Sequence, residues 1–193
     1  SQRMSGLERF RGIDENREAE IEDPPTTDLY ASYAMQGMNE STWYLNHNDG
    51  LKALSQLESA LYFQPQWPGV YASMASIVGS MGYWEMARNI CQMSIQANPK
   101  VGLNYAVLAR IDEEQGRYLE SNQEKEKARS LGYNPQWATS AITLLEKKKE
   151  SGKIQDKSPA EYRNWSEILE KSGCPFLSRL AFQCSEKGMK SLN

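Results

Sequence analysis

The sequence repeats itself with a period of 34 residues through its central part. Tyr71 and Tyr105 are one period apart, and the same interval separates Gly82 from Gly116. A fixed period of this length is typical of folds in which copies of one small unit stack, because each unit buries its apolar face only against its neighbours. This repetition limits the fold more than any other feature of the chain.

The repeated residues indicate that the unit is a pair of helices. Ala75 and Ala109 are small residues in the first helix of each copy, where they allow the second helix to approach closely. The glycine between the two helices permits the turn that reverses the chain. Prolines follow the second helices and are expected to end them, since proline lacks the backbone N–H and restricts the residue before it: Pro65, Pro99 and Pro135.

On these residues the chain resembles the tetratricopeptide repeat family, over roughly two thirds of its length. Good copies span about 68–101 and 102–137, and a looser copy precedes them. The resemblance implies an all-α fold: a right-handed α-α superhelix of about three to four hairpins, with a C-terminal capping helix and a polar N-terminal arm. The third copy departs from the family pattern, which places larger or apolar packing residues at Asp112, Ser121 and Lys125.

The chain divides into three segments: an acidic polar N-terminal arm (1–26), the helical solenoid (27–152) and a C-terminal helical cap (153–193). The arm contains few apolar residues and ends near Pro24-Pro25, so burial cannot offset the entropy lost when it becomes ordered. Three interpretations stay open. The arm is a flexible leader, a segment that lies on the solenoid or on a neighbouring chain, or a link from a removed anchor.

Apolar spacing and turn residues predict the individual helices. The first starts at Thr27 with Thr26 or Thr27 as its N-cap, and the residues from Asn46 to Gly50 end it. The next continues from Leu51 to Pro65. Further helices are expected near 68–81, 83–97, 102–115, 117–131 and 136–150.

The C-terminal part contains a helix start, Ser158-Pro159-Ala160-Glu161, in which Ser is the cap, Pro the first helical residue and Glu returns a hydrogen bond. This helix extends to about residue 172, and Gly173 ends it. Pro175 begins another helix whose apolar stripe suits it to cover the last repeat. A stack needs such a cover, because its terminal repeat otherwise exposes an apolar face.

Composition excludes several classes of function. A net charge of −3 and a pI near 5.4 argue against a nucleic-acid partner, which requires a concentrated basic face. No stretch has the roughly 20 apolar residues that cross a bilayer. Because the chain starts at Ser1, a removed signal, lipid or anchor stays open. The cytoplasm is favoured, and a periplasmic or membrane-tethered location requires such a removed segment.

The sequence offers little for catalysis or metal binding. His47 is the single histidine and lies in a polar turn, where we expect an ordinary loop residue. No catalytic residue, cofactor or metal site is predicted. The odd number of cysteines fits a reducing compartment better than a disulfide framework. Cys91 is expected to be buried, and a bond between Cys174 and Cys184 is an open, less favoured alternative.

In tetratricopeptide stacks the first helices line the concave side, so the resemblance assigns a partner-binding groove to defined positions. The second copy contributes small residues, which would leave the groove open: Gly69, Ala72, Ser76, Gly79 and Ser80. The third copy and the helix after it contribute larger ones: Leu103, Ala106, Arg110, Glu113, Ile142 and Glu146. The alternative is that the small residues only permit tight helix packing.

Tryptophans recur at the junctions between copies. Trp67 and Trp137 both follow a Pro-Gln pair, and Trp84 follows the turn glycine. Each ring either wedges between repeats or stays at the rim of the groove to hold a ligand. Trp43 and Trp165 are expected in the core.

These features favour a non-enzymatic scaffold or adaptor that binds a peptide, a helix or a partner protein in its concave groove, as part of a larger assembly. One alternative is a self-assembling structural protein that uses the N-terminal arm or the C-terminal helix, so a homo-oligomer stays open. Another is a regulatory domain of a larger protein.

Overall fold

The computed structural model describes residues 27–135 and 155–190, and these residues form only α-helices, without a strand. The all-α expectation is therefore confirmed for this part of the chain. The helices are α3 (Thr27–Asn46), α4 (Gly50–Phe63), α5 (Pro68–Ser80), α6 (Trp84–Ala97), α7 (Gly102–Glu114), α8 (Tyr118–Ser130), α10 (Pro159–Lys171) and α11 (Pro175–Lys190). The arm at 1–26 and the helix expected near 136–150 lie outside the described residues.

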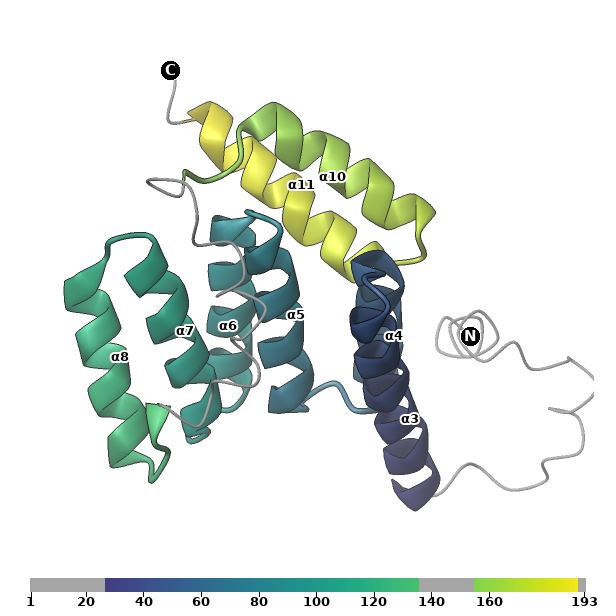
Figure 1. Ribbon diagram of the computed structural model, residues 1–193, viewed down its shortest axis with the longest axis horizontal. Helices are drawn as coiled ribbons and strands as arrows, with labels where there is room; N and C mark the ends of the chain where they lie inside the picture. Colours follow the sequence, from purple (N-terminus) through teal and green to yellow (C-terminus); the bar gives the residue numbers. More distant parts are fainter. Residues whose placement is uncertain (1–26, 136–154, 191–193) are drawn as a thin grey trace, which may run out of the picture.

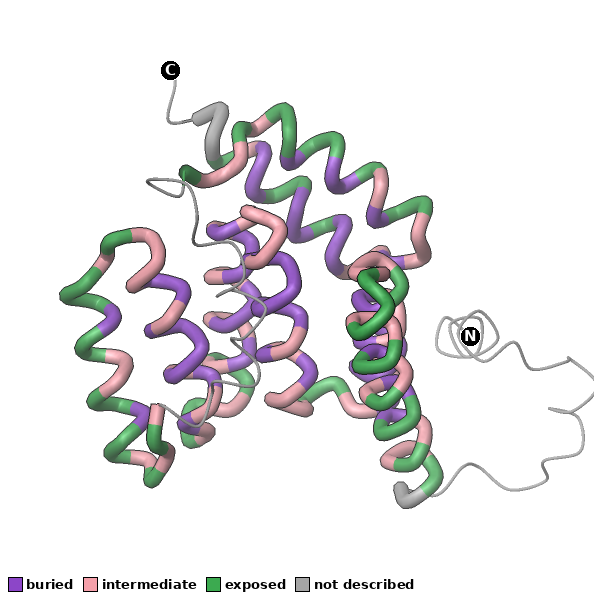
Figure 2. Tube along the Cα trace, in the orientation of Figure 1, coloured by how far each residue is buried: buried purple, intermediate pink, exposed green. Residues whose placement is uncertain are grey.

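Consecutive helices pair as antiparallel hairpins (Figure 1). The hairpins α3–α4, α5–α6 and α7–α8 stand side by side, and α10–α11 lies across the ends of α4, α5 and α6. Helix α7 packs on both α5 and α6, whereas the first hairpin reaches α5 through α4. One cluster of buried apolar side chains connects all four hairpins. Figure 2 shows buried residues, in purple, in each hairpin.

The sequence period is also a period of three-dimensional contacts. The Tyr71 hydroxyl donates a hydrogen bond to the Pro65 carbonyl at 2.8 Å, and the Tyr105 hydroxyl donates to the Pro99 carbonyl at 3.1 Å. Each bond ties the first helix of a hairpin to the end of the preceding hairpin. The two copies therefore share one junction geometry, as stacking of a repeated unit requires.

Glycines with positive φ reverse the chain inside the hairpins. Gly82 has φ 93° and Gly116 has φ 76°, a region that side chains other than glycine adopt at a cost. The same conformation at Gly132, with φ 78°, ends α8 at Ser130. Pro135 therefore does not end this helix, contrary to expectation, because the left-handed glycine cap stops it first.

Close approach of α3 and α4 requires Gly37. A β-carbon added there would lie 2.9 Å from the Gln56 carbonyl oxygen and 3.1 Å from the Ala60 β-carbon. Both neighbours belong to α4, and one is backbone that cannot rotate away. Gly37 therefore lets the two helices of the first hairpin pack at short distance.

Charge pairing explains two of the polar residues that depart from the family pattern in the third copy, Asp112 and Lys125, whereas the buried Ser121 hydroxyl has no hydrogen-bond partner. Asp112 on α7 is fully buried and accepts hydrogen bonds from Arg88 on α6, with the Arg88 Nε at 2.8 Å from Asp112 Oδ1. Glu124 on α8 approaches the same carboxylate, and burial together with the Asp112 charge raises its pKa to about 8. Lys125 pairs with Glu113 at 3.1 Å. Ion pairs thus replace apolar contacts between α6 and α7 and between α7 and α8.

The helix start at Ser158 is confirmed. The Ser158 hydroxyl accepts a hydrogen bond from the Glu161 N–H at 3.3 Å, and the Glu161 carboxylate accepts one from the Ser158 N–H at 2.8 Å. This reciprocal pair satisfies donors that the start of a helix leaves without partners.

The C-terminal hairpin docks on the second hairpin through buried polar contacts. Asp156 accepts hydrogen bonds from the Trp84 N–H at 3.0 Å and from the Tyr162 hydroxyl at 2.8 Å. The Tyr162 hydroxyl in turn accepts one from the Met86 N–H at 3.2 Å. Asp156 thereby supplies the N-terminal cap that Tyr83, the residue before α6, does not provide with its own side chain.

A ring stack and a hydrogen bond to a sulfur atom add to the contacts of the C-terminal hairpin with the second hairpin. The rings of Tyr83 and Trp165 stack at 4.8 Å, and Asn89 on α6 donates to the Cys184 sulfur at 3.4 Å. The expectation that the last helix covers the last repeat is therefore corrected, since the apolar stripe of α11 packs on α4 and α6. An amphipathic stripe specifies that a helix is covered on one side, but not by which neighbour.

The crossing of α3 and α4 gives a first prediction. Gly37→Ala should lower the free energy of unfolding by about 1–2 kcal/mol, because the added methyl overlaps the Gln56 carbonyl. The matched variant is Gly69→Ala, also helical, where the added carbon meets only Trp67 at 3.7 Å. It should raise stability by about 0.5 kcal/mol. Urea denaturation of both variants measures the difference, and an equal effect would contradict the close approach.

A second prediction concerns a buried hydroxyl. Ser94 on α6 is fully buried and its hydroxyl has no hydrogen-bond partner, so Ser94→Ala should raise the free energy of unfolding by about 1 kcal/mol. Ser166→Ala is the control. It removes a buried hydroxyl that donates to the Ser178 carbonyl at 2.9 Å and should destabilise by about 1–2 kcal/mol. Thermal and chemical unfolding should show that Ser94→Ala is more stable than wild type and that Ser166→Ala is less stable.

Candidate functional site

Two cavities open beside the first hairpin. One, of about 310 Å³, lies among α4, α5 and α11, and we name it the outer cavity. The other, of about 390 Å³, lies between α3 and the junction of α4 with α5, and we name it the junction cavity. Both are within the size range of small ligand sites.

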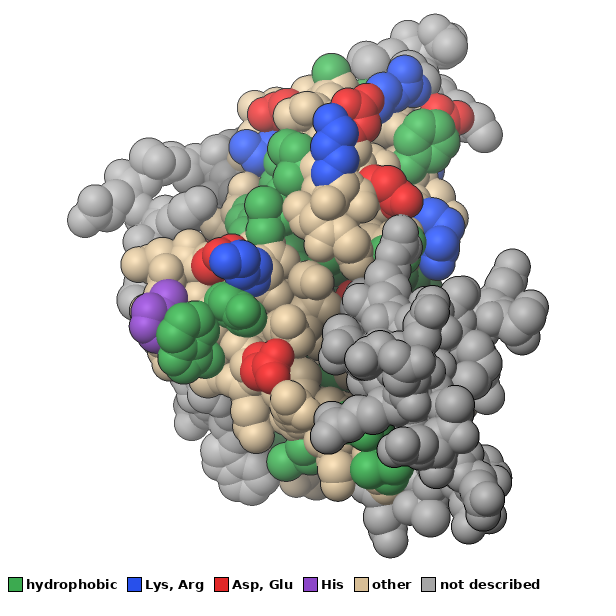
Figure 3. Space-filling model, turned by 90° about the vertical axis from the view of Figure 1, so that its right-hand side faces the viewer, with side chains coloured by type: hydrophobic (Ala, Val, Ile, Leu, Met, Phe, Trp, Pro, Cys, Tyr) green, Lys and Arg blue, Asp and Glu red, His purple; other side chains and the backbone are tan. Residues whose placement is uncertain are grey.

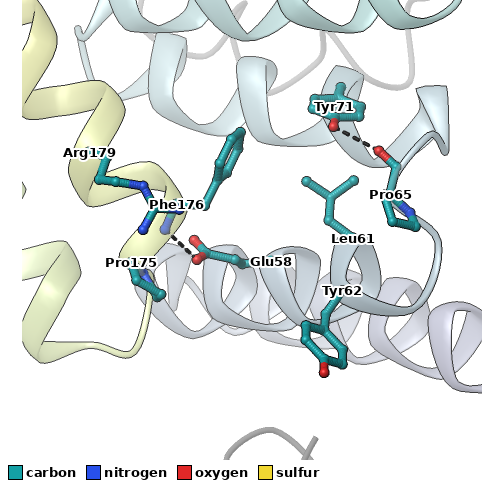
Figure 4. Close-up of a pocket in the computed structure, with 8 residues that line it drawn as sticks. All are labelled: Glu58, Leu61, Tyr62, Pro65, Tyr71, Pro175, Phe176 and Arg179. Carbon is teal, nitrogen blue, oxygen red and sulfur yellow. Dashed lines mark hydrogen bonds between the residues drawn. The ribbon is translucent and has the colours of Figure 1, made fainter. Parts of the chain in front are cut away.

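The outer cavity has mainly apolar and aromatic walls with two charged groups among them, Glu58 and Arg179 (Figure 4). The rings of Tyr71 on α5 and Phe176 on α11 meet edge to face at 6.5 Å. Its other lining residues are Leu61, Tyr62, Pro65 and Pro175. The cavity is therefore formed by the packing of α11 against α4 and α5.

Glu58 is already engaged in holding α11. Its carboxylate accepts hydrogen bonds from the Phe176 N–H at 2.6 Å and the Leu177 N–H at 3.2 Å, so it caps the start of that helix from α4. Burial raises the pKa of Glu58 to about 7, although the two N–H groups and the positive charge of Arg179 act to lower it. Both oxygens of the Glu58 side chain are therefore used within the chain, where they connect α4 to the start of α11.

The junction cavity has uncharged walls. Ala31 and Met35 of α3 form one side, and the other consists of Gln64, Gln66, Trp67 and Pro68. Met35 is half exposed, at 50% of its surface. The cavity lies on the side of the first helices, where the family resemblance places a binding groove.

Of the residues singled out from the sequence, Trp67 lines this cavity, and Gly69 lies next to Trp67. Trp67 is half-buried and packs against the core, and Gly69 lies beside its indole ring, since an added β-carbon would be 3.7 Å from the Trp67 Nε1. Ala31 and Met35 were not recognised from the sequence. The spacing of Tyr30 and Ala34 marks the inward side of this helix. Ala31 and Met35 follow these two residues and lie outside that inward pattern.

Three of the small groove residues of α5 are not accessible. Ala72 and Ser76 are exposed over only 2% and 1% of their surface, and Gly79 is buried as well. The Ser76 hydroxyl donates to the Ala72 carbonyl at 2.8 Å, and the half-buried Ser80 donates to the Ile77 carbonyl at 2.6 Å. The expected open stretch is therefore replaced by tight packing, in which serine hydroxyls bond to their own helix.

The groove positions of α7 are largely paired or buried. Ala106 is buried, and Leu103 is half-buried against the core. Arg110 pairs with Glu114 at 2.5 Å, and Glu113 pairs with Lys125 of α8. The other predicted residues, Ile142, Glu146 and Trp137, lie outside the described part of the chain.

The remaining tryptophans separate into buried and exposed rings. Trp84 and Trp165 are buried, exposed over 3% and 5% of their surface, so Trp84 packs in the core and is no rim residue. Trp43 was expected in the core and is 56% exposed, where its ring stacks on His47 at 3.8 Å. Among the helices of residues 27–135 and 155–190, α3 packs chiefly on α4, which leaves the Trp43 ring uncovered by them.

Neither a reactive thiol nor a cluster of metal-ligating side chains is found among the described residues. Cys91, Cys174 and Cys184 are free and buried, and burial raises the pKa of each thiol, to about 12 for the last two. Such thiols stay protonated and unreactive at neutral pH. Within 27–135 and 155–190, no group of three or more acidic, cysteine or histidine side chains is placed to hold a metal ion.

None of the described helices combines the length and apolar character that a membrane crossing requires. In comparisons with known proteins, no protein-family model and no curated protein matches the chain.

Glu58 gives a prediction of pH dependence. Its pKa is about 7 in the folded protein against 4.5 for an ordinary glutamate, so the folded state holds this proton between those pH values and the unfolded state does not. Stability from this group is complete below pH 4.5 and is lost as pH rises through 7, by up to about 3 kcal/mol. Glu58→Gln cannot ionise and should remove this fall.

The measurement is urea denaturation from pH 4 to 8 on wild type, Glu58→Gln and the exposed control Glu167→Gln. The contribution of Glu124, whose pKa is raised in the same direction, is common to all three proteins and cancels. Parallel profiles for wild type and Glu58→Gln would show that the buried carboxylate is not the source of the fall.

Proposed function

We propose that this chain is a non-enzymatic interaction scaffold of the tetratricopeptide type, which holds a peptide or helix of a partner protein within a larger assembly. The observation that carries the proposal is the repeated hairpin: the Tyr–Pro hydrogen bond and the turn glycine recur after one sequence period. Stacked helical hairpins present an extended surface to partners.

The surface that best supports partner binding is the junction cavity. Its walls are uncharged, it lies beside the first helices, and it is large enough for one or two apolar side chains. Met35 and Trp67 supply the flexible and the aromatic surfaces that anchor residues of a partner prefer. The amides of Gln64 and Gln66 can donate to and accept from the backbone of a bound peptide.

The chemistry of the cavity defines the partner. A peptide that inserts an aliphatic or aromatic side chain fits uncharged walls, whereas a strongly charged segment would lose its hydration without gaining an ion pair. Arg110 and Glu113 retain a smaller role in this proposal, because each already pairs within the chain. Such pairs discriminate among partners more than they add affinity.

Docking of the terminal helix into a neighbour's groove, an alternative for self-assembly, has less support. Helix α11 buries Leu177 and Ala181, and its first N–H groups bond to Glu58 of the same chain. Release of α11 would expose this apolar stripe and leave the Glu58 carboxylate buried without partners.

The test is a selection from a displayed library of random peptides on the full chain, followed by affinity measurements on variants. Ala31→Phe should fill the junction cavity and weaken the selected peptides at least about tenfold, since the lost contact is of the order of 1.4 kcal/mol or more. Gln123→Phe adds the same ring to an exposed position of α8 and should leave binding unchanged. Equal binding to both variants would contradict the proposed site, and a selection without enrichment would contradict the scaffold function.

A further inference from the structure

The outer cavity differs from the junction cavity because its wall carries charged groups. Glu58 of α4 and Arg179 of α11 belong to this wall, and the other lining residues are apolar or aromatic. Figure 4 shows the two charged side chains extending toward each other from their helices. A cavity of about 310 Å³ with apolar walls and a few polar groups that converge is typical of a site for a small ligand.

Arg179 has N–H donors that are available for a ligand. Within residues 27–135 and 155–190 its guanidinium takes part in no hydrogen bond or ion pair, and the residue is exposed. Other cations of the C-terminal hairpin are paired, Arg163 with Glu186 at 3.4 Å and Lys157 with Glu161 at 3.6 Å. Figure 3 shows acidic and basic side chains next to each other at the upper end of the molecule, where this hairpin lies.

Glu58 does not cancel the charge of Arg179 at mildly acidic pH. Its carboxyl group accepts from the Phe176 and Leu177 N–H groups, and burial raises its pKa to about 7, with the charge of Glu170 on α10 acting in the same direction. At pH 6 the group is therefore mainly protonated and neutral. A protonated carboxyl group can also donate its O–H to an anion. The charge that remains in the cavity wall is the guanidinium of Arg179.

The rest of the wall accepts an apolar body. The rings of Tyr71 and Phe176 meet edge to face at 6.5 Å with an interplanar angle of 81°, and Leu61 and Pro175 lie beside them. The Tyr71 hydroxyl already donates to the Pro65 carbonyl, so this bond holds the Tyr71 ring in place. An aromatic ring that enters the cavity can continue the edge-to-face arrangement.

We propose that the outer cavity binds a small organic acid, a monocarboxylate whose aromatic or branched aliphatic body packs between α4, α5 and α11 and whose carboxylate pairs with Arg179. A guanidinium binds a carboxylate through two parallel N–H···O bonds, which gives the ligand a fixed orientation. The two cavities share no lining residue, so this proposal does not depend on the partner function.

Titration of the full chain with 3-phenylpropionate at pH 6, followed by NMR of the backbone amides, tests the site. The ligand should bind with a Kd of about 1 mM or tighter, as expected for a ligand of this size. The largest shifts should fall on Leu61, Phe176 and Leu177. Neutral 3-phenylpropionamide should bind at least about fivefold more weakly, because it lacks the charge that Arg179 recognises. Equal affinity for acid and amide, or no shift at several millimolar acid, would overturn the proposal.

Two further ligands separate the sources of such a carboxylate. Acetate lacks the apolar body and should bind at least about tenfold more weakly than 3-phenylpropionate. N-acetylphenylalanine represents the end of a peptide and carries an amide that would lose its hydration against the apolar wall, so it should bind at least about threefold more weakly. Tighter binding of N-acetylphenylalanine would overturn the small-acid ligand in favour of a peptide terminus.

Variants of the full chain test the residue that recognises the acid. Arg179→Gln should weaken 3-phenylpropionate about tenfold and leave 3-phenylpropionamide unchanged, since the apolar wall stays intact. Lys187→Gln is the matched control, because it removes an exposed cation from the same helix outside the cavity. Ala31→Phe fills the junction cavity instead and should also leave the acid unchanged. An equal loss in Arg179→Gln and Lys187→Gln, or a loss in Ala31→Phe, would overturn the assignment to the outer cavity.

Discussion

Close contact between paired helices is the constraint on which this structure depends. At the crossing of α3 and α4, Gly37 leaves no room for even a single methyl group before the Gln56 carbonyl is reached. A β-carbon added at Gly102, at the start of α7, would collide with the Tyr133 β-carbon and lie 3.1 Å from the Ala128 carbonyl oxygen. Small residues at such points bring the helix backbones together, so that the larger apolar side chains interdigitate above and below them.

Polar contacts decide how the C-terminal hairpin joins this stack. Glu58 caps α11 from α4, and Asp156 caps α6 from the segment that precedes α10. In both cases a carboxylate meets the N–H groups at the positive end of a helix dipole, which is the favourable arrangement. The two caps fasten the last hairpin to the first and second hairpins. The cost of burying Glu58 appears as its raised pKa.

The surfaces available for partners follow from this asymmetric arrangement. Because the first hairpin reaches α5 through α4, the junction cavity opens between α3 and the start of α5. On α3, Ala34 and Gly37 are buried, whereas Met35 and Trp43 stay exposed. The proposed partner site is therefore a consequence of how the first hairpin sits in the stack.

The sequence by itself determined the helices and their pairing. Periodic small residues, turn glycines and the capping residues Ser158 and Glu161 act within one or two turns of the chain, so their effect can be predicted without knowledge of distant neighbours. Even local patterns compete, since Gly132 ended α8 before Pro135 could. The tertiary structure decided which faces are covered: it exposed Trp43, buried Ala72 and Ser76, and placed α11 on α4 and α6. Amphipathic spacing specifies that one face of a helix is buried, but the neighbour that buries it is selected by contacts between residues far apart in the sequence, such as Glu58 with Phe176.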